Sequence, residues 1–164
     1  LVDGGLLFED NQHIDTTAKF TFASGTSVSV FAVNTMSDTQ NAYLLRLSAY
    51  ILWKNGTTRR HQVGSANATA GSATVGTEEL WTSIMNVNSS GGTGNFFTNG
   101  TLTSATANQN IGSGVVTNKS INIGGAGATS HWNGTINEII VYTSDQSANR
   151  PAIDANIKNQ YEIS

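Results

Sequence analysis

The chain has 164 residues, with eight Lys and Arg against eleven Asp and Glu, one Pro and no Cys. The lack of Cys excludes a disulfide framework, and a net charge of −3 argues against a dedicated nucleic-acid-binding protein. Thr, Asn and Ser make up about a third of the chain, but Leu, Ile, Val and Phe still number 37, so the composition favours a folded chain over a disordered one.

Short apolar or alternating runs recur along the chain and predict β-strands. They fall at residues 6–8, 20–22, 28–33, 43–47, 50–53, 59–63, 81–87, 95–98, 121–123 and 136–142. The abundant Thr, Ser and Asn disfavour helix interiors, because their side chains compete for backbone hydrogen bonds. About ten short strands broken by Gly, Asn and Ser are the pattern of an all-β sandwich or barrel.

Three Asn-Gly pairs, at residues 55–56, 99–100 and 133–134, predict turns. A two-residue type I′ turn needs a positive φ at both central residues, which Asn and Gly tolerate. We therefore expect hairpin tips at 55–56 and 99–100, and at 133–134 a turn that enters the next strand. Two Gly-rich stretches, 91–94 and 124–127, are also interpreted as turns, because neither has the pattern of a phosphate-binding loop.

The last predicted strand, residues 136–142, is apolar on both faces, which predicts a central strand. Simple alternation places Ile136 and Glu138 on the face that also carries residues 140 and 142, with residues 139 and 141 opposite. Glu138 on this apolar face is expected to be buried or half-buried and satisfied by backbone donors or an Arg.

The C-terminal segment breaks the β pattern. From Ser147 onward, apolar residues at positions 152, 153, 157 and 161 recur at helical spacing and predict a helix over about 148–161. Ser147 or Asn149 is the expected N-cap, and Pro151 fits only the first turn, where its missing N–H costs little.

The final third of the chain carries a resemblance to a known family. Residues 121–125 (Ile-Asn-Ile-Gly-Gly), residues 132–142 (Trp-Asn-Gly-Thr-Ile-Asn-Glu-Ile-Ile-Val-Tyr) and the helix that follows them resemble the closing strands and C-terminal helix of the laminin-G-like or concanavalin-A-like lectin jelly roll, in its phage and secreted bacterial form. The resemblance implies one antiparallel jelly-roll domain over residues 1–164. It leaves function open, because this family includes lectins, adhesion modules, glycanases and structural domains.

A search for catalytic groups argues against an enzyme. Glycan-cleaving relatives need two carboxylates that flank the scissile bond, often supplied as Glu-x-Asp-x-x-Glu, and no such run is present. The nearest acidic pair is Glu78 and Glu79, which adjoin on a strand and therefore point to opposite faces. A Gly-x-Ser-x-Gly elbow is also missing from the sequence.

Charge is distributed unevenly in the first half of the chain. Residues 1–38 carry five acids and one Lys, whereas residues 39–77 carry four basic residues and no acid. One interpretation pairs these two groups across a sheet. The other is a patch around the 55–56 hairpin that binds an acidic glycan or a partner subunit and consists of Trp53, Lys54, Arg59, Arg60 and His61.

Aromatic residues matter in a glycan-binding protein, because the apolar face of a sugar stacks on a ring while polar groups bind its hydroxyls. Trp81 lies in a strand and is expected in the core. Trp132, between His131 and Asn133 at a turn, and Trp53, beside a hairpin, are expected to be partly exposed. Trp53, His131, Trp132 and Asn133 are therefore candidate ligand contacts.

Calcium is the cofactor to consider, since some laminin-G-like and lectin relatives bind it at loop tips through Asp, Asn and backbone oxygens. Asp38 with Asn41 is the best local oxygen cluster, and Asp3, Asp10 and Asp15 are alternatives. The competing interpretation for each is a hydrogen-bonded Asp that shapes a turn. No other cofactor is expected.

Two functions from different classes remain. The first is a non-catalytic glycan- or cell-surface-binding module of an extracellular or virion protein. The second is a structural virion domain, in a capsid decoration, tail or fibre, that contacts neighbouring subunits; a degenerate glycanase is a minor third. No membrane insertion is predicted, because no apolar run of about 18 residues is present, and the start at Leu1 suggests a processed product or a piece of a longer protein.

Overall fold

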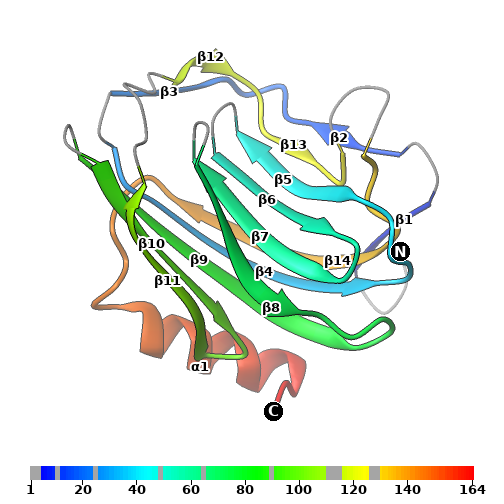
Figure 1. Cartoon of the computed structure of the whole chain (residues 1–164). Helices are drawn as coiled ribbons and strands as arrows, with labels where there is room; N and C mark the ends of the chain where they lie inside the picture. Colours follow the sequence, from blue (N-terminus) through cyan, green and yellow to red (C-terminus); the bar gives the residue numbers. More distant parts are fainter. Residues whose placement is uncertain are drawn as a thin grey trace.

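The computed structural model describes residues 5–9, 12–23, 26–47, 50–63, 66–88, 91–109, 116–125 and 130–164. Two six-stranded antiparallel sheets face each other, a two-stranded ribbon lies beside them, and one helix packs on the outside (Figure 1). The predicted all-β antiparallel sandwich with one C-terminal helix is confirmed.

We call the two sheets sheet I and sheet II. Sheet I has the order β1 (Leu6–Phe8), β14 (Gly134–Tyr142), β4 (Val28–Met36), β9 (Glu78–Asn88), β10 (Gly91–Thr98) and β11 (Thr101–Gln109). Sheet II has the order β2 (Ile14–Asp15), β13 (Asn122–Ile123), β5 (Ala42–Leu47), β6 (Tyr50–Asn55), β7 (Thr58–Val63) and β8 (Ala66–Ser72). The ribbon pairs β3 (Phe20–Phe22) with β12 (Val116–Lys119), and the helix is α1 (Arg150–Tyr161).

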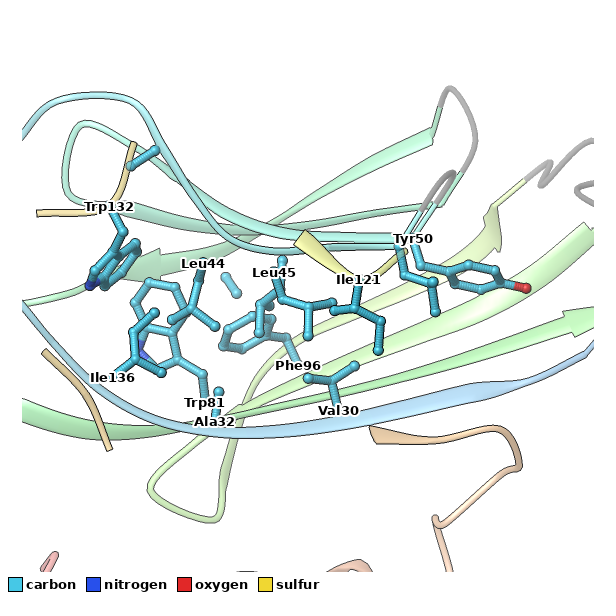
Figure 2. Close-up of a cluster of buried hydrophobic side chains, with 14 of the residues drawn as sticks. Val30, Ala32, Leu44, Leu45, Tyr50, Trp81, Phe96, Ile121, Trp132 and Ile136 are labelled. Atoms are coloured by element: carbon cyan, nitrogen blue, oxygen red, sulfur yellow. The ribbon is translucent and has the colours of Figure 1, made fainter. Parts of the chain in front are cut away.

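The main core fills the space between the two sheets (Figure 2). Trp81 from sheet I meets Trp132 edge to face, with ring centroids 5.6 Å apart, and both side chains are fully buried. A second, smaller core lies on the other side of sheet I, where Ile157 of α1 packs against Phe31, Val33 and other side chains of the sheet. Strand β4 is therefore buried on both faces.

A β-bulge changes the predicted faces of β14. Its pairing with β4 shifts register between Ile136 and Glu138, so Ile136 joins Ile139 and Val141 on the main core, while Ile140 and Tyr142 face α1. The predicted placement of Ile136 with Ile140 and Tyr142 was therefore wrong, because alternation breaks at a bulge. The prediction that apolar side chains would occupy both faces of this strand was right.

The Asn-Gly turns differ from one another. Asn99 and Gly100 both have positive φ, 52° and 82°, as the predicted type I′ tip requires. At the other hairpin Asn55 pairs with Thr58, so the loop is Gly56-Thr57, one residue later than predicted, and of these two only Gly56 has a positive φ.

The stretch predicted as a turn at residues 91–94 is instead the first half of strand β10. A Cβ on Gly94 would lie 2.7 Å from Cε1 of His61, so glycine is needed there to admit the imidazole between the sheets. The other glycine-rich stretch predicted as a turn is residues 124–127. Gly124 has a positive φ of 75°, which is consistent with a turn, and residues 126 and 127 lie outside the described residues.

The C-terminal helix begins at Arg150, within the predicted range, and Asn149 is its N-cap residue, although it makes no side-chain capping hydrogen bond. Pro151 occupies the first turn, as expected. Among the described residues, α1 is too short and too polar to cross a membrane, and no other helix is present.

Candidate functional site

The predicted patch around the 55–56 hairpin does not exist as one surface. Adjacent residues of a strand point to opposite faces, so Trp53 and Arg60 face outward and are half-buried, whereas Lys54, Arg59 and His61 point between the sheets. Lys54 is fully buried, and Arg59 and His61 are 6% and 1% exposed. The prediction of a continuous exposed patch was therefore wrong for these three residues.

Lys54 anchors the loop after β4 to the core of the protein. Its Nζ donates to Oδ1 of Asp38 at 2.6 Å, to the Asp38 carbonyl at 3.0 Å and to the Gln40 carbonyl at 2.6 Å, so all three protons are used. The ammonium also lies 5.6 Å from the ring centroid of Trp132. A buried cation with this many partners stabilises the loop and is closed to a ligand.

The oxygens proposed for calcium already have partners. Burial raises the pKa of Asp38, but hydrogen bonds from Lys54 and from the Gln40 N–H outweigh it, and the pKa lies below its usual value. Asn133 donates to the other carboxylate oxygen at 3.2 Å, and Oδ1 of Asn41 accepts the Gly56 N–H at 3.0 Å. The Lys54 ammonium takes the place beside this carboxylate that a metal cation would need.

The alternative calcium ligands predicted from the sequence are Asp3, Asp10 and Asp15. Asp15 is exposed and accepts a hydrogen bond from Asn122, while Asp3 and Asp10 lie outside the described residues. Among the residues that the structure describes, no three His, Asp or Glu side chains gather to hold a metal ion. Calcium binding stays a prediction.

Arg59 and His61 tie the two sheets together. Arg59 binds both carboxylate oxygens of Glu79, at 2.8 and 2.5 Å, and Nε1 of Trp81 donates to the same carboxylate at 2.7 Å. His61 Nδ1 lies 2.8 Å from Oγ of Ser83, and burial lowers the pKa of His61 to about 4. These are cross-sheet contacts of the interior.

The same contacts bear on catalysis. Glu79 is buried in the ion pair with Arg59, whereas Glu78, its neighbour, is hydrogen-bonded by Asn137. The two carboxylates therefore do not flank a common cleft, in agreement with their expected opposite orientation. Glu138 is half-buried as predicted, but its Oε2 has no hydrogen-bond partner among the described residues, so the predicted satisfaction by an Arg or backbone donors is not seen for this atom.

The predicted exposure of Trp132 was also wrong. Its side chain is 0% exposed, because the ring belongs to the core between the sheets and packs against Trp81 and Lys54. His131 is half-buried, with its ring 5.7 Å from that of His13. Asn133 is occupied in the Asp38 loop. This predicted group is therefore mainly structural.

The outward face of sheet II carries a different set of residues. Tyr43, Trp53, Arg60 and Thr69 are direct cross-strand neighbours on β5, β6, β7 and β8. The rings of Tyr43 and Trp53 are 6.1 Å apart, and the Arg60 guanidinium lies 5.1 Å from the Trp53 ring centroid. We call these four residues the aromatic row.

A bulge brings one more cation to the aromatic row. The register of β5 against β6 shifts between Tyr43 and Leu45, so Leu44 and Leu45 are both buried in the core. Tyr43 and Arg46, three positions apart, consequently both face outward, with the guanidinium 5.9 Å from the Tyr43 ring centroid. Sequence alternation alone places these two residues on opposite faces, so sequence reasoning missed this pair.

A second cross-strand row runs beside the aromatic row. It follows the registers Asn122 to Arg46, Arg46 to Ile51, Ile51 to Gln62 and Gln62 to Asn67. Amide and guanidinium groups along this row offer donors and acceptors next to aromatic surface. Helix α1 covers sheet I and leaves this face of sheet II without a helix (Figure 1).

Comparison with known proteins gives fold relatives at low sequence identity. No protein-family model and no curated protein matches the chain. A heptameric SAP-like pentraxin from Limulus polyphemus aligns with a TM-score of 0.65 and 14% identity over 89% of this chain and 77% of that chain. The CBM40 of a Ruminococcus gnavus IT-sialidase, bound to α2,3-sialyllactose, aligns with a TM-score of 0.61 and 12% identity over 85% and 94%.

A mutant Trypanosoma rangeli sialidase with trans-sialidase activity aligns with a TM-score of 0.59 and 15% identity over 76% of this chain, but over only 22% of that chain. At these identities the likeness concerns the fold. The chain therefore has a jelly-roll sandwich fold, as the resemblance in its sequence implied.

Proposed function

We propose that this protein is a non-catalytic glycan-binding module whose binding surface is the outward face of sheet II. The observation that carries the proposal is the aromatic row, where two half-buried rings lie among guanidinium, hydroxyl and amide groups. A pyranose ring has an apolar face that stacks on an aromatic side chain and hydroxyls that need donors and acceptors nearby. The aromatic row supplies both.

Unused donors on this surface support the proposal. Nε1 of Trp53 and Nε of Arg60 are shielded from solvent and have no hydrogen-bond partner among the described residues. Leaving such a group unpaired costs about 1–3 kcal/mol. A ligand oxygen that reached either atom after a small side-chain movement would recover part of this free energy.

Relatives with the same fold give further support. The CBM40 neighbour is described as bound to a sialylated sugar, and this chain covers most of its length. The sialidase match covers a small part of that enzyme, and the carboxylates of Glu78 and Glu79 are engaged in separate structural contacts here. Binding without catalysis is therefore the function that the described residues support best.

The test is a glycan array followed by titration calorimetry, with and without calcium, on the natural chain and on Trp53→Ala. We expect the substitution to weaken the affinity about tenfold, since a stacked ring contributes on the order of 1 kcal/mol or more. Phe97→Ala is the matched control, because Phe97 also carries a stacked cation, Arg150 at 4.0 Å, but lies on sheet I. No binding to any glycan, or equal losses in both variants, would overturn the proposal.

The location of the protein and its partners are part of the same proposal. A glycan-binding module meets its ligands on cell surfaces, so we propose an extracellular or virion location, with host or cell-surface glycans as partners. Immunogold labelling of intact cells and of virions would test this. Signal confined to the cell interior would contradict it.

A further inference from the structure

We propose that the pocket between the β3–β12 ribbon and sheet II binds an oxyanion, the carboxylate or sulfate group of an acidic glycan. This inference rests on the proposed function, because it names the class of glycan that the aromatic row would bind. The pocket has a volume of about 420 Å³ and is lined by Lys19, Arg46, Asn118, Lys119, Ser120 and Asn122.

The lining is cationic and rich in hydrogen-bond donors. Three of these six residues are Lys or Arg, the others are amides or a hydroxyl, and no acid is among the described residues that line the pocket. Charge-assisted hydrogen bonds from ammonium and guanidinium groups are the strongest that a protein offers to carboxylate and sulfate oxygens. The chemistry of the pocket therefore matches an anion.

Backbone pairing and side-chain contacts hold these groups in place. Lys119 pairs with Phe20 across the ribbon, which brings it next to Lys19, and Lys19 donates to Oγ of Ser120. On the other side of the pocket Asn122 pairs with Arg46 across β13 and β5. Elements far apart in the chain thus bring three cations to one place.

The distribution of charge over the molecule singles out this face. Four of the eight basic residues have partners elsewhere: Lys54, Arg59 and Arg150 form ion pairs with Asp38, Glu79 and Asp154, and Lys158 donates to the Asn99 carbonyl. Within the described ranges, the other four make no ion pair. These are Lys19, Arg46, Arg60 and Lys119, and all lie at the pocket or on the aromatic row.

Four cations without an acidic partner among the described residues make this face locally positive, although the chain carries a net charge of −3. An anionic ligand is attracted to such a face and gains charge-assisted hydrogen bonds there. Asp15 contacts the lining of the pocket, but its hydrogen bond comes from Asn122 and not from a cation.

Arg46 connects the pocket to the aromatic row. It lines the pocket, and its guanidinium lies over the ring of Tyr43, which neighbours Trp53. A saccharide stacked on the aromatic row can therefore direct an acidic substituent, or a neighbouring acidic residue of the glycan, into the pocket.

The first experiment tests the pocket without a sugar. Sodium sulfate and sodium acetate are titrated into ¹⁵N-labelled protein at constant ionic strength. We expect saturable shifts of the backbone amides of residues 119–122, lost in Lys119→Gln and kept in Lys158→Gln, a cation outside the pocket that serves as the matched control. Shifts that do not saturate, or that are the same in both variants, overturn the oxyanion site.

The second experiment tests whether glycans use the pocket and separates carboxylate from sulfate. Sialyllactose is compared with lactose, and a galactose sulfate with galactose, on the natural chain and on Lys119→Gln, a pocket cation that lies on the β3–β12 ribbon and not on the aromatic row. We expect the acidic member of at least one pair to bind about tenfold more tightly, and Lys119→Gln to reduce that preference without weakening the neutral sugar. Neutral and acidic sugars that bind equally would overturn the inference while leaving glycan binding intact.

If no saccharide binds, the proposed function fails and the sulfate titration alone decides whether the pocket is an anion site. Higher salt provides an independent check. Screening by salt should weaken the binding of the acidic sugar and leave the binding of the neutral sugar nearly unchanged. A preference that does not depend on salt would contradict an electrostatic origin.

Discussion

The inward and outward faces of β6 and β7 show how one short stretch of sequence serves two purposes. Arg59 and Arg60 are adjacent and chemically identical, yet Arg59 is locked between the sheets on Glu79 while Arg60 lies on the outside against Trp53. The inward cations Lys54 and Arg59 each form an ion pair, whereas the outward Arg46 and Arg60 lie against aromatic rings and form no ion pair among the described residues. In these strands the pleat therefore decides whether a basic residue is neutralised by an acid of the fold.

The largest effect should come from breaking an inward pair. Arg59→Gln leaves the Glu79 carboxylate buried without its cation, which typically costs about 3–5 kcal/mol. We expect a loss of stability of that size in urea denaturation. A double variant, Arg59→Met with Glu79→Leu, removes both charges and should recover much of the loss. If the single variant is as stable as the natural chain, the pair is not a stabilising contact.

Acid should weaken the same interior. His61 has a pKa of about 4 in the fold because burial disfavours its charged form, whereas an unfolded His has a pKa of about 6.5. The folded state therefore binds fewer protons than the unfolded state below pH 6.5, and stability falls as the pH drops from about 6.5 to about 4. The shift corresponds to about 3 kcal/mol in total.

Urea denaturation at a series of pH values measures this loss. His61→Gln should be less stable at neutral pH, because it disturbs the contact with Ser83, but it should show a flatter dependence on pH in this window. An equally steep slope in the variant would assign the acid sensitivity to other groups.

Packing around the imidazole should have a smaller effect. Gly94→Ala places a methyl group 2.7 Å from His61 Cε1, so the ring or strand β10 has to shift. We expect a loss of about 1–3 kcal/mol, typical of overpacking, in the thermal or urea unfolding curve. His61→Ala in the same background should relieve the clash, so the two substitutions should be non-additive.

The smallest effect on stability should come from the outward face. Arg60→Gln removes a cation that contacts Trp53 on the surface, and a change within about 0.5 kcal/mol is expected. The affinity of the Arg60→Gln variant for an acidic glycan should nevertheless fall. A loss of stability comparable to that of Arg59→Gln would erase the contrast between the two faces.

Several features of the fold were predictable because they depend on residues close together in the chain. The run from residue 28 to 33 forms the first part of β4, the Asn99-Gly100 turn adopts its expected conformation, and the C-terminal apolar stripe lies on α1. Strands poor in apolar residues were missed: β8 is largely Ala, Asn and Thr, and no strand was predicted there. The conformation of β8 depends on its pairing with β7, because the segment lacks an apolar pattern of its own.

The site was predictable only in part. The sequence predicts Trp53 and Arg60 as ligand contacts. Strict alternation within residues 59–63 also places Arg60 on the opposite face of the strand from Arg59 and His61. Tyr43 and Arg46 were not found, because a bulge places both on the outward face. Lys19 and Lys119 were not found because they meet only through the ribbon.

By itself, then, the sequence determined the all-β class, the C-terminal helix and the turn at Asn99-Gly100, because these follow from the conformational preferences of a few neighbouring residues. Only the tertiary structure decided that Lys54 and Trp132 are buried and that Lys19, Arg46 and Lys119 share a pocket. These outcomes depend on strand register, on bulges and on which sheet covers which face. Those are properties of pairing between distant segments, and a local pattern of residue types does not contain them.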